Sequence, residues 1–62
     1  MGERLALLMK EKGLTASEFA RRVGVSRQAV SFWVTGTYEP SIASLVKIAN
    51  EFDTTVDWLV GR

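Results

Sequence analysis

Residues that favour the start or the end of a helix recur along the whole chain, and this punctuation limits what the chain can fold into. Serine and threonine favour a helix start, whereas glycine favours a helix end. They alternate at short intervals: Gly13, Thr15, Gly24, Ser26, Gly36 and Ser41. Between them, apolar residues recur at intervals of three and four, the period of an α-helix, and not at the interval of two that a strand requires. The sequence therefore predicts an all-α fold of short helices joined by tight turns.

Five helices are predicted, at about residues 2–12, 15–23, 26–35, 41–52 and 56–60. The second helix has the clearest start, because Thr15 and Glu18 have the spacing of a capping box, in which each side chain bonds the other residue's backbone N–H. Pro40 disfavours a helix at the residue before it, which separates the third helix from the fourth. A threonine, Thr54 or Thr55, is expected to cap the fifth helix.

One apolar core is expected to hold these helices in a single domain over residues 1–62. A chain of this size buries only about 60% of its unfolded surface, but 47% of these residues are hydrophobic, which is enough for a core. Trp58 and Leu59 are expected to close the core at its C-terminal end. The broadest buried face is predicted on the fourth helix: Ile42, Leu45, Val46, Ile48, Ala49 and Phe52.

The residue types that are missing exclude several classes of protein. The chain has no cysteine and no histidine, which excludes disulfide scaffolds, zinc fingers and the usual histidine-based catalysis. Its acids are scattered, and it has neither a nucleophile–base pair nor a phosphate-cradling glycine loop, so no enzyme activity, cofactor or metal is expected. No apolar run approaches the ~20 residues of a membrane span. A cytoplasmic protein is therefore expected.

Basic residues gather in the middle of the chain, although the net charge is only +1. Arg21, Arg22 and Arg27 lie close together, and no acid lies between Glu18 and Glu39. Such a cluster is either a solvated helix face or part of a nucleic-acid-binding surface. Charge alone gives these two interpretations equal weight, so the choice depends on the motif around the cluster.

The spacing of small and apolar residues around Gly24 predicts a helix-turn-helix. Ala20 precedes Gly24 by four residues, and Val30 and Trp33 follow it by six and nine. Two helices that cross steeply on a three-residue turn need a small side chain at their contact, which Ala20 provides, and the turn needs the positive φ that Gly24 tolerates. Val30 and Trp33 can then fix the angle from inside. Such a rigid pair lets its second helix enter a DNA major groove.

These residues, with others in order along nearly the whole chain, resemble a known family. The matching stretches are Lys12-Gly13-Leu14-Thr15, Phe19-Ala20, Val23-Gly24-Val25-Ser26, Ala29-Val30-Ser31, Trp33, Gly36, Glu39-Pro40 and Val56-Asp57-Trp58-Leu59. They are similar to the phage repressor and Cro type of helix-turn-helix domain, also called lambda-repressor-like or XRE-like. The resemblance implies a compact five-helix bundle whose second and third helices form the helix-turn-helix. It also implies sequence-specific binding of double-stranded DNA, usually by a homodimer on a two-fold operator, in a bacterial or phage-encoded transcriptional repressor or regulator.

Carried over by position, the resemblance implies which side chains contact DNA. The base contacts would come from the recognition helix, 26–35: Arg27, Gln28, Ser31 and Phe32. Their chemistry fits, since arginine can pair bidentately with guanine, glutamine with adenine, and an aromatic edge can pack on a thymine methyl. The phosphate contacts would come from helix N-termini, the basic cluster and the loop after the recognition helix: Ser26, Ser17, Arg22, Thr35 and Thr37.

Six positions depart from the family's pattern, and none of these departures removes the motif. Ala16 stands where the family usually has a phosphate-contacting glutamine, so one anchoring contact is missing. Met9 and Val34 stand where many members have an arginine–glutamate pair, and an apolar replacement of a buried ion pair is often neutral or stabilising. Asp53 stands where a glycine cap is usual, and aspartate tolerates the left-handed conformation better than most residues.

Phe32 and Leu7 are apolar at positions where the family usually has polar, solvent-facing residues. An exposed Phe32 has three interpretations: contact with thymine methyls, a protein interface, or engineering of the domain. The competing function is therefore a protein-interaction or self-association module on the same fold, which uses Phe32 and Leu7 and binds DNA weakly and without sequence preference. The length fits either a complete small regulator or the N-terminal piece of a longer repressor.

Overall fold

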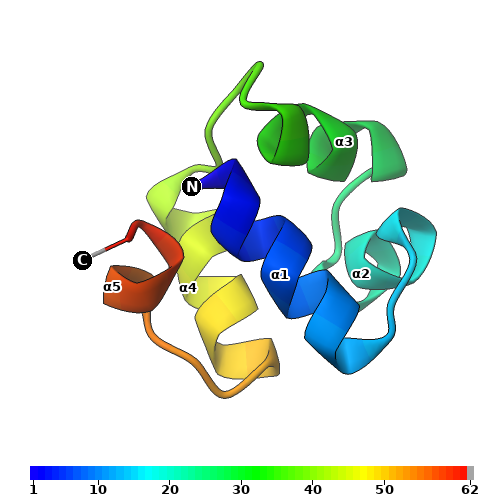
Figure 1. The fold of residues 1–62 in the computed structure, drawn as a ribbon. Helices are drawn as coiled ribbons and strands as arrows, with labels where there is room; N and C mark the ends of the chain where they lie inside the picture. Colours follow the sequence, from blue (N-terminus) through cyan, green and yellow to red (C-terminus); the bar gives the residue numbers. More distant parts are fainter. Residues whose placement is uncertain (62) are drawn as a thin grey trace.

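The computed structural model describes residues 1–61 and contains five α-helices in the predicted order (Figure 1). Their bounds are α1 (Gly2–Lys12), α2 (Ala16–Val23), α3 (Arg27–Thr35), α4 (Ile42–Glu51) and α5 (Val56–Leu59). No strand occurs within residues 1–61. The predicted all-α class and the five predicted helices are confirmed. None of the helices that the structure describes has the length and apolarity to cross a membrane.

Side-chain caps explain where four of the helices begin. At α2, the Thr15 N–H donates to Glu18 Oε1 at 3.0 Å and the Glu18 N–H donates to Thr15 Oγ1 at 3.1 Å, which completes the predicted capping box. The hydroxyl oxygens of Ser26, Ser41 and Thr55 each accept a hydrogen bond of 3.1 Å from the N–H three residues further on. These bonds satisfy backbone donors that a helix start leaves unpaired. Local sequence therefore determines the helix starts.

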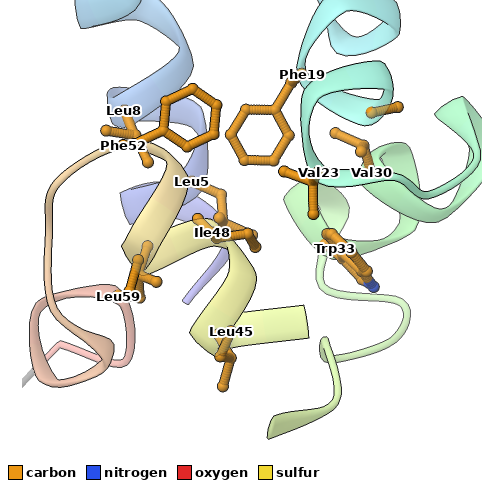
Figure 2. Packing of buried hydrophobic residues seen from close by; sticks show 12 residues of the cluster. Leu5, Leu8, Phe19, Val23, Val30, Trp33, Leu45, Ile48, Phe52 and Leu59 are labelled. Carbon is orange, nitrogen blue, oxygen red and sulfur yellow. The ribbon is translucent and has the colours of Figure 1, made fainter. Parts of the chain in front are cut away.

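One apolar core joins the five helices (Figure 2). Each helix contributes one completely buried residue: Leu5, Phe19, Val30, Ile48 and Leu59, all 0% exposed. The rings of Phe19 and Phe52 are stacked, with centroids 4.9 Å apart and planes 3° apart, so they connect α2 to the end of α4. Removal of any one helix would expose apolar surface on its neighbours, so the helices depend on one another for stability.

The buried face of α4 is narrower than the sequence predicted. Ile42 is 78% exposed and Val46 is 44% exposed, so the prediction that both are buried was wrong. They lie one helical turn apart and form one column on the helix surface. α4 contacts α2 and α5, and its buried residues are Leu45, Ile48 and Ala49. Apolar periodicity indicates how much of a helix is apolar, but not how much of it the neighbouring helices cover.

The C-terminal end of the core is closed mainly by Leu59. Trp58 is half-buried at the edge of the core, and the guanidinium of Arg4 lies 5.1 Å from its ring centroid. Trp58 therefore contributes less to the interior than predicted. Asp53 has a φ of 53°, the left-handed conformation expected at that position.

The first turn of α1 lies directly against the end of α3. A Cβ atom on Gly2 would lie 2.9 Å from the carbonyl oxygen of Trp33 and closer still to that of Val34. Backbone atoms cannot rotate away, so this contact requires glycine.

Met9 and Val34 are both half-buried and pack against the core, as expected for apolar residues at the positions of an ion pair.

Candidate nucleic-acid interface

The turn between α2 and α3 is held by hydrogen bonds and by packing. Gly24 has a φ of 83°, and its N–H donates to the carbonyl of Ala20 at 2.8 Å. The N–H of Val25 donates to the same carbonyl at 3.0 Å. Ala20 is buried, and the side chain of Ser26 then caps α3. The orientation of α3 is therefore fixed by α2, and α3 lies at one edge of the bundle (Figure 1).

The residues of α3 are divided between the core and the solvent. Val30 and Trp33 are buried, whereas Arg27, Gln28 and Ser31 are exposed. Three of the four predicted base-contact residues thus share the exposed face near the N-terminus of α3. Unpaired N–H groups give this end of a helix a partial positive charge. The face combines a cation, an amide and a hydroxyl, which can all form hydrogen bonds to base edges.

Phe32, the fourth predicted base-contact residue, is half-buried and not fully exposed. The ring of Tyr38 packs against it edge-to-face, with centroids 5.2 Å apart and planes at 81°. Tyr38 itself is 62% exposed. Sequence reasoning missed this pair, because Tyr38 lies beyond the Gly36 turn, where helical periodicity makes no prediction.

Ser26 and Ser17, two of the predicted phosphate contacts, lie at helix N-termini, where the helix dipole favours an anion. Both are exposed. The oxygen of Ser26 accepts from the Ala29 N–H at 3.1 Å, which occupies a lone pair and leaves the hydroxyl proton available for donation. Ser17 lies in the first turn of α2. Each serine can therefore donate to an anion without disturbing its helix.

Thr35 and Thr37 are hydrogen-bonded to each other and to the end of α3. Thr35 Oγ1 lies 3.0 Å from the carbonyl oxygen of Ser31 and 2.9 Å from Thr37 Oγ1. When the Thr35 proton is donated to the carbonyl, the Thr37 proton is donated to Thr35. The N–H of Thr37 also donates to the carbonyl of Phe32 at 2.9 Å. A phosphate contact from either threonine would require one of these bonds to break.

Arg22 is directed towards α4. Its Nε and Nη2 atoms donate to Glu51 Oε2 at 3.0 and 2.8 Å, and its guanidinium lies 4.9 Å from the ring centroid of Phe52. The side chains of Arg22 and Glu51 are 45% and 38% exposed. Sequence reasoning missed this ion pair, because its members are 29 residues apart. Its geometry gives Arg22 a partner other than a phosphate.

The carboxylate of Glu18 is fixed at the start of α2. The backbone N–H of Thr15 and then the Thr15 side chain hydrogen-bond to it, and they lower the pKa of Glu18 below its ordinary value of 4.5. Glu18 is therefore ionised at neutral pH and remains part of the cap. Within residues 1–61, no group of acids could hold a metal ion.

The helix-turn-helix family model matches residues 5–59 of this chain. The uncharacterized HTH-type transcriptional regulator YqaE of Bacillus subtilis strain 168 is 33% identical over 58 residues, which covers 94% of this chain and 50% of YqaE. The HTH-type transcriptional activator BcrR of Enterococcus faecalis is 38% identical over 58 residues, which covers 94% of this chain and 28% of BcrR. The chain spans half or less of the length of these relatives.

Two solved structures share the fold. The N-terminal DNA binding domain of SinR from Bacillus subtilis superimposes with a TM-score of 0.89 at 32% identity, covering 98% of this chain and 90% of that chain. The SinR protein/SinI protein complex gives the same TM-score and identity, and covers 98% of this chain and 60% of that chain. The predicted bundle topology is therefore that of a known DNA-binding domain.

Proposed function

This chain belongs to the helix-turn-helix family, of the phage repressor and Cro type, and from this premise we propose that it binds double-stranded DNA sequence-specifically to regulate transcription. The observation that carries the proposal is the exposed polar face of α3, with Arg27, Gln28 and Ser31, on a turn fixed at Gly24. In a helix-turn-helix, the N-terminal residues of the second helix contact base edges in the major groove. Arg27, Gln28 and Ser31 lie within the first five residues of α3, the second helix of this motif.

Base readout would come from four side chains of α3. Arg27 would pair with O6 and N7 of guanine, and Gln28 with N6 and N7 of adenine. Ser31 would donate to or accept from a neighbouring base edge. Phe32 would offer an apolar surface to the same groove.

Phosphate binding would come first from Ser26 and Ser17, whose exposed hydroxyls lie at the N-termini of α3 and α2. Two other predicted contacts, Thr35 and Thr37, would each require an existing hydrogen bond to be exchanged for the phosphate. Arg22 bonds Glu51 with two of its five N–H donors, and the carboxylate of Glu51 already offsets its charge. The serines would therefore provide the main anchors.

A homodimer on a two-fold operator would place two α3 helices about 34 Å apart, one turn of DNA. One copy measures 25 × 23 × 20 Å, so two adjacent copies can span that distance. Such a dimer would repress transcription by occupying its operator. It would act by binding and not by catalysis, in the cytoplasm, where a bacterial chromosome lies.

Selection from a random duplex pool, followed by affinity measurements across a salt series, tests this function. We expect an enriched two-fold motif bound ~10³-fold more tightly than a scrambled duplex. Arg27→Ala is expected to weaken specific binding by about 1–3 kcal/mol and to relax one base position. Lys10→Ala, at an exposed position on α1, is the control and should change neither. No enrichment, with weak binding that disappears as salt rises, would refute the proposal.

Self-association is the second candidate, because exposed apolar side chains lie on α1 and α4. Leu7 and Val46 are each 44% exposed and Ile42 is 78% exposed. Phe32 is less suited to this function than the sequence suggested, since Tyr38 partly covers it. Sedimentation of wild type, Phe32→Ser and Ile42→Ser at matched concentration distinguishes the candidates. Identical sedimentation of all three proteins would exclude self-association through Phe32 or Ile42.

A further inference from the structure

Phe32 and Tyr38 form an aromatic pair that is not part of the apolar core. Phe32 is half-buried, yet it is not among the apolar side chains of residues 1–61 that pack against the core, and Tyr38 is 62% exposed. We propose that this aromatic pair reads the 5-methyl group of a thymine in the major groove. The inference rests on the proposed function and adds to it a base preference at one position.

The aromatic pair is organised before any ligand binds. The N–H groups of Thr37 and Tyr38 both donate to the carbonyl of Phe32, at 2.9 and 3.4 Å, so the loop folds back onto the residue that it supports. The two rings then meet edge-to-face at 5.2 Å. Since this contact restricts the Phe32 side chain in the free protein, less conformational entropy is lost when Phe32 meets DNA.

The chemistry of the pair and its surroundings favours a thymine methyl as the ligand. A phenyl ring has no hydrogen-bonding group for the polar base edges, and the major groove presents one apolar group, the methyl of thymine. Gln28 lies one helical turn from Phe32 on the same side of α3 and is exposed. No acid lies between Glu18 and Glu39 to repel phosphates. A protein partner would instead need a wider apolar surface than a ring beside a glutamine and Ser31.

Helix geometry predicts where this thymine lies in the operator. Gln28 and Phe32 are four residues apart, which is about 6 Å along a helix at ~1.5 Å per residue. Base pairs are spaced by ~3.4 Å. The thymine should therefore lie one or two base pairs from the adenine that Gln28 reads.

Tyr38 is a positioning residue in this arrangement. Its ring contacts Phe32, whereas its hydroxyl has no part in holding the pair together. Tyr38→Phe should therefore preserve thymine discrimination, and Tyr38→Ala should reduce it. If Tyr38 only stabilised the fold, Tyr38→Ala would lower stability. It would leave unchanged the ratio of the affinities for a duplex with the thymine methyl group and a duplex without it.

Deoxyuridine, which lacks only the methyl group of thymine, provides the test. Each thymine of the selected duplex is replaced in turn with deoxyuridine, in both half-sites. For each protein variant, the affinity for the thymine duplex is then divided by the affinity for the deoxyuridine duplex. Wild type is expected to lose about four-fold per half-site at one position, from ~0.8 kcal/mol per buried methyl-sized group. Phe32→Ser should show a ratio of about one at that position. Lys10→Ala, at an exposed position on α1 outside both candidate surfaces, is the control and should behave as wild type.

The outcomes separate this inference from the proposed function. Thymine reading is overturned if deoxyuridine leaves the affinity for the enriched site unchanged at every position. It is also overturned if deoxyuridine lowers the affinity of Phe32→Ser as much as that of wild type. Either outcome leaves the proposal of DNA binding intact. A selected site without a thymine one or two base pairs from the adenine also overturns it. Loss of self-association in Phe32→Ser, without loss of uridine discrimination, would assign the pair to a protein interface. The absence of any enriched site would overturn both proposals.

Discussion

Replacement of Arg22 with alanine distinguishes the two functions assigned to this side chain. The sequence predicts a phosphate contact, whereas the structure places Nη2 2.8 Å from Glu51 Oε2 and the guanidinium 4.9 Å from the ring centroid of Phe52. Because both charged side chains are more than a third exposed, the ion pair contributes no more than about 1 kcal/mol. Packing of the guanidinium on the ring adds about 0.5–1 kcal/mol. Arg22→Ala is therefore expected to lower the free energy of unfolding by roughly 0.5–2 kcal/mol.

The variant should remain folded, because a domain of this size has a free energy of unfolding of about 3–9 kcal/mol. Thermal denaturation should show Tm lowered by about 4–8 °C for each kcal/mol lost. Glu51→Gln is the matched control: it removes the ion pair but leaves Arg22 on Phe52, so the loss should be smaller.

DNA binding by Arg22→Ala is then compared with wild type across a salt series. The slope of log affinity against log salt reports the number of phosphates that the protein contacts. The structure predicts an unchanged slope, since the carboxylate of Glu51 already compensates the charge of Arg22. A slope reduced by about one for each bound copy would refute this reasoning and support the phosphate contact predicted from the sequence.

Three further predictions concern packing and the cap of α2. Gly2→Ala should destabilise the fold by roughly 1–3 kcal/mol in chemical denaturation, because the new Cβ meets backbone carbonyls of α3; a neutral result would show that α1 can shift away. Leu59→Ala, at a completely buried position, should lower the free energy of unfolding by about 2–5 kcal/mol. Ile42→Ser, at a 78% exposed position, should change it by no more than about 0.5 kcal/mol. Equal losses in the two variants would contradict the burial pattern. The lowered pKa of Glu18 stabilises the fold fully above its ordinary value of 4.5, and this contribution is lost as pH falls through the folded-state pKa. The stability difference between wild type and Glu18→Gln in urea should therefore shrink below about pH 4.5, and a difference independent of pH would rule out the charge of Glu18 as its cause.

The sequence by itself determined the helices, because their boundaries depend on residues close together in the chain. The caps at Thr15, Ser26 and Ser41 join atoms three residues apart, and the turn at Gly24 needs one residue with positive φ. Apolar residues at helical spacing then indicated which residues of each helix could be buried in the core. The exposed face of α3, with Arg27, follows from the same local periodicity, which is why most of the candidate site could be predicted.

Only the tertiary structure decided which surfaces are covered and which distant side chains meet. Two apolar columns on α4 look alike in the sequence, and the crossing of α4 with its neighbours buries one and leaves Ile42 exposed. The Arg22–Glu51 pair and the approach of Gly2 to α3 connect residues that no local pattern relates. The packing of Tyr38 on Phe32 depends on how the loop after α3 folds back. Hydrogen bonds within a helix are set by sequence spacing of three or four, whereas packing between helices depends on where all five lie relative to one another.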